Sequence, residues 1–113
     1  MNPGTVTDAA TLGIPLEPVP AAQVVDGAPQ AGFVELETVE GVEVGVWEHT
    51  PGASTDVESD EVFVVLSGSA TVAFDDPALD DIELHPGAVV RLTAGMRTVW
   101  TVRETLRKVY IAG

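Results

Sequence analysis

The chain has 113 residues, of which 5 are basic and 18 are acidic, so its formal net charge is -13. This length is typical of one domain, and a 45% share of hydrophobic residues indicates a packed core rather than a disordered chain. The charge excludes nucleic acid as a partner, because proteins bind it mainly through lysines and arginines that neutralise phosphates. It disfavours anionic membrane surfaces for the same reason. The absence of cysteine excludes disulfides and cysteine metal sites.

No segment has the pattern of a secretion signal, and no apolar run approaches the roughly 20 residues of a membrane helix. We therefore expect a cytoplasmic protein.

Residues 1–30 differ in composition from the rest of the chain, because they hold five of its eight prolines. Prolines at this density forbid a helix and favour an extended N-terminal arm. The arm is expected either to be a loosely ordered tail or to lie across the domain or across a second subunit.

From Phe33 onward, short apolar runs alternate with turn residues at nearly regular spacing, which is typical of a sandwich or barrel. No window of ten or more residues has a helical period, so almost no helix is expected. We predict an all-β domain over residues 31–113, with strands at Phe33–Thr38, Val42–His49, Glu61–Leu66, Ala70–Phe74, Asp81–His85, Ala88–Leu92, Thr98–Arg103 and Leu106–Ile111. Turns are expected between them, for example at Ser67-Gly68, where glycine supplies the positive φ.

The run Val62–Leu66 is apolar at every position, so both faces of this strand should be covered. The core covers the inner face, and something else must cover the outer one. Because large exposed apolar patches usually mark an interface, we predict a homodimer.

The spacing of Glu61, Gly68 and Gly87, followed by Gly95 and Thr98, resembles the two conserved boxes of the cupin superfamily. Those boxes contain HxH, Glu and Gly, and later Gly, PxG and His. The segments around two tryptophans resemble, within that superfamily, the small cupins named after ureidoglycine aminohydrolase. The resemblance spans residues 32–111 and implies a single-domain, cupin-type jelly-roll β-barrel.

Metal-binding cupins hold a divalent ion with two histidines and a glutamate from the first box and a histidine from the second. Only Glu61 of these four ligands is retained here. The other positions hold Thr98 in the second box and, in the first, Ser54 with Asp56 or Thr55 with Val57. A single carboxylate is not a transition-metal site, so no metal cofactor is predicted. The one alternative is a divalent ion at a rebuilt site of His49, Asp56 and Glu61.

By its family position Glu61 should point into the barrel, where a carboxylate needs a proton or a cation. Alternation along the strands then places Thr98 and Trp100 on the inner face as well. If the last strand turns Lys108 and Tyr110 inward, the single lysine can pair with Glu61 where the family holds its metal. Trp100 and Tyr110 would then be either walls of a small-molecule site or ordinary core residues.

The strand Val42–His49 allows two orientations. If its valines face the core, Glu48 reaches the mouth of the pocket and His49 points away. In the opposite orientation, Trp47 and His49 line the cavity.

These features predict a protein that binds a small molecule without the usual cupin metal. Its candidate ligand-binding residues are Glu48, Glu61, Thr98, Trp100, Lys108 and Tyr110. One alternative is an enzyme that acts on a small polar metabolite, such as a sugar derivative or a ureide-like acid, with Glu61 as general base or with a non-standard metal. The other is a structural or accessory dimer module, which a filled barrel would favour.

Overall fold

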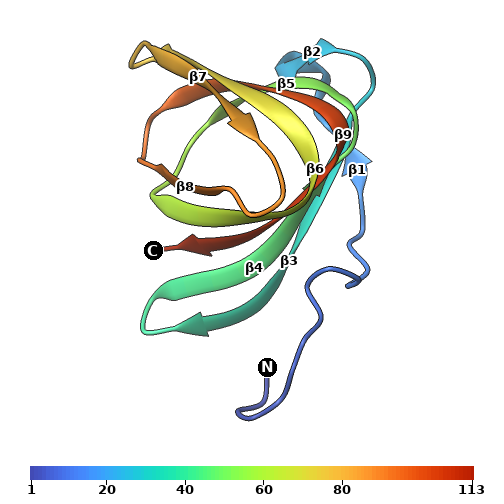
Figure 1. The fold of residues 1–113 in the computed structure, drawn as a ribbon, viewed down its shortest axis with the longest axis vertical. Coiled ribbons are helices and arrows are strands. Elements are labelled where there is room, and N and C mark those ends of the chain that lie inside the picture. Colours follow the sequence, from blue (N-terminus) through green and yellow to red (C-terminus); the bar gives the residue numbers. More distant parts are fainter.

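Nine strands make up most of the chain, and every pairing between them is antiparallel. The computed structural model describes residues 1–113 as a sheet curled into a barrel (Figure 1). The strands are β1 (Glu17–Pro18), β2 (Val24–Asp26), β3 (Gln30–Val39), β4 (Val42–His49), β5 (Gly52–Val57), β6 (Glu61–Asp76), β7 (Leu79–Leu84), β8 (Val89–Leu92) and β9 (Arg97–Ala112). The predicted all-β barrel is confirmed. Helix is limited to one 3-10 turn, η1 (Ala21–Gln23), and none is long and apolar enough to span a membrane.

β6 and β9 organise the barrel. Each has 16 residues, and they pair along their whole length, from Glu61 opposite Ala112 to Asp76 opposite Arg97. β9 also pairs with β4 and β5, and β6 also pairs with β7 and β8. Each long strand joins two strands that the sequence predicted as separate, whereas β1, β2 and β5 were not predicted.

The Ser67-Gly68 junction is a bend within β6 and not a turn between two strands. The β6–β9 register shifts on both sides of Ser67, and Gly68 has a φ of 93°. A Cβ at Gly68 would collide with the backbone carbonyl of Thr105 on β9. Glycine therefore lets the two long strands bend together without separating.

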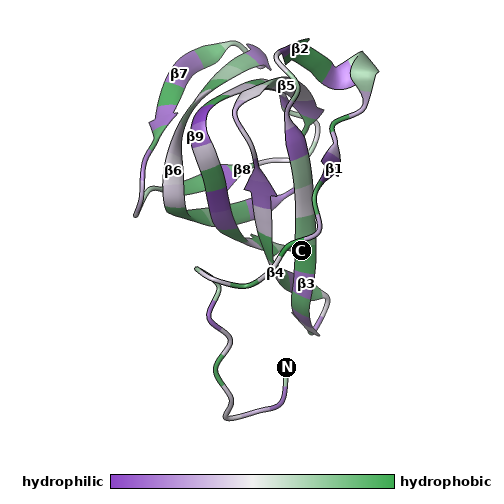
Figure 2. Cartoon of the chain, turned by 90° about the vertical axis from the view of Figure 1, so that its right-hand side faces the viewer, coloured by the Kyte–Doolittle hydropathy of each residue, from purple (hydrophilic) through white to green (hydrophobic).

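One hydrophobic cluster forms the core of the barrel, from inward residues of the strands around it. Figure 2 shows hydrophobic and hydrophilic segments alternating along these strands, as expected when only one face meets the core. The cluster contains Phe63, Val65, Ala70, Val72, Leu84, Leu92, Trp100, Val102, Leu106 and Tyr110.

The first 30 residues follow the outside of the barrel of their own chain. β1 pairs with β3 and β2 pairs with β5. The segment before β1 is held by Arg107 of β9, whose guanidinium donates hydrogen bonds to the carbonyl oxygens of Ala9 (3.1 Å) and Leu12 (2.7 Å). Further along, the carbonyl oxygen of Pro15 lies so close to Gly32 of β3 that a Cβ at position 32 would collide with it.

Candidate functional site

The orientation of β4 determines which side chains enter the barrel. Trp47 lies opposite Lys108 of β9, and its ring centroid is 5.5 Å from that of the buried Trp100. The next residue, Glu48, therefore faces outward and forms an ion pair with Arg107 (2.9 Å). Of the two orientations that the sequence allowed, the structure has the one with Trp47 and His49 inside. It leaves Glu48 outside the pocket, because the valine face of β4 packs beneath the N-terminal segment that Arg107 holds.

The Lys108 ammonium lies inside the barrel in a cage of aromatic rings. Its Nζ is 3.4 Å from a carboxylate oxygen of Glu61 and 4.2 Å from the ring centroid of Phe63. The ring centroids of Trp47 and Trp100 each lie 4.7 Å away. Burial lowers the pKa of Lys108, and nearby carboxylates oppose this effect. The pairing that the sequence suggested is thus present, with the charge further stabilised by the faces of the rings.

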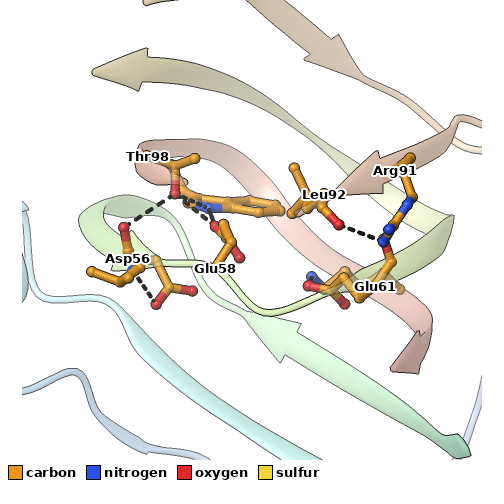
Figure 3. A network of polar contacts seen from close by, with 9 residues as sticks. Asp56, Glu58, Glu61, Arg91, Leu92 and Thr98 are labelled. Carbon is orange, nitrogen blue, oxygen red and sulfur yellow. Dashed lines mark hydrogen bonds and ion pairs between the residues drawn. The ribbon is translucent and has the colours of Figure 1, made fainter. Parts of the chain in front are cut away.

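Glu58 is a second buried carboxylate, and two donors from β9 hold it (Figure 3). The Thr98 hydroxyl donates to it at 2.6 Å and the Trp100 indole N–H donates at 3.0 Å. Buried polar groups need such partners, so Thr98 and Trp100 fix the position of the Glu58 carboxylate.

Asp56 lies at the edge of the same carboxylate group, opposite Thr98 on β9. Although the residue is exposed at the barrel mouth, the loss of water around its carboxyl raises the pKa of Asp56 to about 6. The charge of Glu58 contributes to this rise, and a hydrogen bond from the Val57 backbone N–H opposes it. Asp56 therefore changes its charge close to neutral pH.

Tyr110, two residues after Lys108 on β9, forms another wall of the site. Its hydroxyl donates a hydrogen bond to Glu43, and burial, followed by this contact, raises the pKa of Tyr110 well above its ordinary value. The ring lies directly over Gly45, its cross-strand neighbour, where a Cβ would collide with it. The ring of Phe33 meets it edge-on, with a centroid distance of 6.3 Å. Glycine at position 45 thus sets the position of this wall.

These side chains surround a pocket of about 360 Å³. Its lining residues are Phe33, Glu43, Trp47, Asp56, Val57, Glu58, Ser59, Glu61, Lys108, Tyr110 and Ala112. A second pocket of about 260 Å³ shares Trp47 and Asp56 with the first and continues to His49, Ser54 and the β1 segment. Trp47 is therefore the common wall of both pockets.

Three of the six predicted ligand-binding residues line the first pocket, namely Glu61, Lys108 and Tyr110. Sequence reasoning did not include Glu43 and Glu58 among the candidates. Alternation along β4 could have placed Glu43 beside the inward Trp47, four residues further on. Glu58 lies between two strands, where no periodicity indicates its direction.

A family model described as the EutQ-like cupin domain matches residues 36–110. The chain belongs to the EutQ-like cupin family. The EutQ protein of Clostridium difficile has a similar structure, with 16% sequence identity and a TM-score of 0.66 over 84% of this chain and 74% of that one. A protein of unknown function from Pseudomonas syringae pv. tomato, of the DUF861 family, is 18% identical, with a TM-score of 0.74 over 91% and 45% of the two chains.

A third structure extends the similarity to almost the whole chain. It is a DUF1255 protein of unknown function from Acidithiobacillus ferrooxidans, 25% identical, with a TM-score of 0.62 over 97% of each chain. No curated protein shows significant similarity to this EutQ-like cupin. These structures share its fold.

The residues of this EutQ-like cupin do not fit the metal ion that the wider superfamily holds. Both ring nitrogens of His49 contact oxygens of the protein, Nδ1 the Thr50 carbonyl (2.6 Å) and Nε2 the Ser54 hydroxyl (2.9 Å). No group of three or more His, Cys, Asp or Glu side chains is arranged to hold a metal. His49, Asp56 and Glu61 are therefore not gathered into one set of ligands.

Proposed function

We propose that this EutQ-like cupin binds a small molecule in the pocket beside Lys108. The observation that carries this proposal is the position of Lys108, buried between three rings and paired with Glu61. Its ammonium and the wall formed by Trp47 and Tyr110 face the same pocket.

The size and lining of the pocket support binding. Small-molecule sites typically occupy about 300–1,000 Å³ and combine aromatic walls with a few polar groups. The pocket has about 360 Å³, which suits a small metabolite and distinguishes this barrel from one filled by its own side chains.

Thermal-shift screening of a metabolite library, followed by titration of tryptophan fluorescence, tests this function. We expect at least one compound to raise the melting temperature of the protein and to bind saturably. Trp47→Leu should abolish that binding, because it removes the common wall, whereas Glu83→Gln, on the exposed surface of β7, should retain it. Absence of any binding compound, or binding unaffected by Trp47→Leu, would contradict the proposal.

A second candidate is an enzyme that acts on a small polar metabolite, and Asp56 is the observation that favours it. A general acid or base works best when its pKa is near the working pH, and the pKa of Asp56 is raised to about 6. Glu61, the base suggested by the sequence, is engaged with Lys108. A kcat that falls at least tenfold in Asp56→Asn, measured at saturating concentrations of a bound compound, would support this candidate.

The two tryptophan segments that resemble the ureidoglycine aminohydrolase cupins both contribute to this site. Trp47 and Trp100 enclose the lysine ammonium. This supports kinship with that subfamily in fold. Without its metal ligands, it does not support the reaction of its namesake.

We also propose that the outer face of β6, β8 and β9 binds a second copy of the chain. The cross-strand partners of the half-buried Val62 and Val64 include Ile111 and Val89, which are 41% and 66% exposed. Light scattering after size-exclusion chromatography should find a dimer for the native chain and a monomer for Val89→Glu. Val6→Glu, a matched change in the exposed N-terminal segment, should leave the dimer intact.

A further inference from the structure

We infer that the pocket beside Lys108 selects a small organic cation, an alkylammonium or quaternary ammonium group, over neutral and anionic molecules of the same shape. This inference rests on the proposed binding function and names the class of ligand.

The charges around the pocket are unbalanced. Four carboxylates line it, from Glu43, Asp56, Glu58 and Glu61, against one ammonium, from Lys108, which leaves a formal charge of -3 when all are ionised (4 negative, 1 positive). Only Glu61 has a cation within 4.0 Å.

Four other cationic groups form ion pairs away from the pocket, and Arg97, which lines a neighbouring hollow with Asp56, has no carboxylate oxygen within 4.0 Å. Arg91, Arg103 and Arg107 each pair with a carboxylate outside it, and the N-terminal amine pairs with Glu37. A ligand that brings its own positive charge therefore gains electrostatic free energy that a neutral ligand does not, and an anion is repelled.

The walls of the pocket suit an organic ammonium. Phe33, Trp47 and Tyr110 present aromatic surface beside the carboxylates. Rings combined with negative charge are how proteins recognise alkylated ammonium groups, because the face of a ring attracts a cation and its carbon surface accepts the alkyl part.

The chain already solvates one ammonium in this way. Three ring faces and one carboxylate surround the Lys108 Nζ at distances of 3.4 to 4.7 Å. The Trp47 ring, which also walls the pocket, therefore already accepts a cation near its face.

Three compounds of one shape and different charge test the inference directly. Choline and 3,3-dimethylbutan-1-ol differ only in that a neutral carbon replaces the quaternary nitrogen, and 3,3-dimethylbutanoate has a carboxylate in place of the alcohol carbon and hydroxyl. Isothermal titration of the native protein at pH 7.5 should give a dissociation constant for choline at least tenfold below that for the alcohol, and no measurable binding of the acid. Raising the salt from about 50 mM to about 500 mM should weaken choline binding and leave alcohol binding unchanged.

A pair of charge-neutralising variants assigns the effect to the pocket. Asp56→Asn preserves the shape of the side chain and should weaken choline binding at least fivefold without changing the affinity for the alcohol. Asp81→Asn changes the net charge equally, on an exposed residue of β7, and should leave both affinities unchanged. Circular dichroism melting confirms that both variants are folded.

The failure of the inference can be told from failure of the proposed function. Equal affinity for choline and the alcohol, tighter binding of the acid, or an equal effect of both variants would overturn the selection for cations while leaving the binding function intact. If choline does not bind but a neutral or anionic library compound binds in a manner that depends on Trp47, the inference also fails and the function stands. If no compound of any charge binds, both fail.

Discussion

Replacing Lys108 by methionine tests whether the caged ammonium holds the interior of the barrel together. The Lys108 side chain is 6% exposed and its partner Glu61 is 12% exposed, so the pair is shielded from water. Removing one partner of a buried ion pair costs about 3–5 kcal/mol, because the remaining charge is left uncompensated. The separation of 3.4 Å is long for such a pair, so we expect a loss at the lower end, about 3 kcal/mol of unfolding free energy at pH 7.

A second change in the same chain separates charge from packing. Methionine preserves most of the apolar stem of the lysine, and adding Glu61→Gln removes the charge that Lys108→Met leaves unpaired. The double variant should recover at least about 1.5 kcal/mol relative to the sum of the two single losses, measured by urea denaturation. As a control, Glu83→Gln breaks the exposed pair with Arg103, which water screens, and should leave stability nearly unchanged. Additive losses in the double variant, or a loss from Lys108→Met no larger than that of the control, would refute the reasoning.

Three further predictions concern the pocket and its surroundings. The pKa of Asp56 is raised from 3.8 to about 6 in the folded protein, so the folded state loses stability as pH rises through this window. Asp56→Asn should therefore stabilise the protein at pH 8 by about 1 kcal/mol, after allowance for solvent screening, and have little effect at pH 4 when both are compared by urea denaturation. Gly45→Ala should push the Tyr110 ring from its place, lowering stability by about 1–3 kcal/mol in the same assay and weakening ligand binding. Arg107→Met should free the carbonyls that it now binds, and hydrogen exchange across residues 1–16 should become faster while exchange in β6 stays unchanged.

The sequence predicted the positions of most strands, because apolar residues alternate wherever one face meets the core. It did not predict β5, Gly52–Val57, whose residues are mostly small or polar. The inward residues of β5, Ser54 and Asp56, face polar partners at the site instead of the core, so the alternation that marks a strand is missing. The break expected inside β6 was wrong for a different reason. Glycine at position 68 serves a bulge as well as a turn, and only the partner strand decides between them.

The candidate site was predictable where strand parity applied. Parity along β9 gave Lys108 and Tyr110 the same direction, and the family position of Glu61 supplied the partner. The orientation of Trp47 depended on which face of β4 the N-terminal segment covers, and no local pattern carries that information. The hydrogen bonds of Glu58 join residues forty positions or more apart, so they follow only from the assembled barrel.

The sharing of β9 among three partner strands has a consequence for how the chain folds. β4, β5 and β6 all pair with residues 97–112, which are made after them during synthesis. Contacts between residues so distant along the chain form slowly, because a long loop must close before they contribute any stability. Until residues 97–112 are available, the strands made earlier expose unpaired edges and apolar faces, which favour aggregation. We therefore expect the barrel to close late in folding and the aromatic cage around the lysine to form with it, since Trp100 and Lys108 both belong to β9.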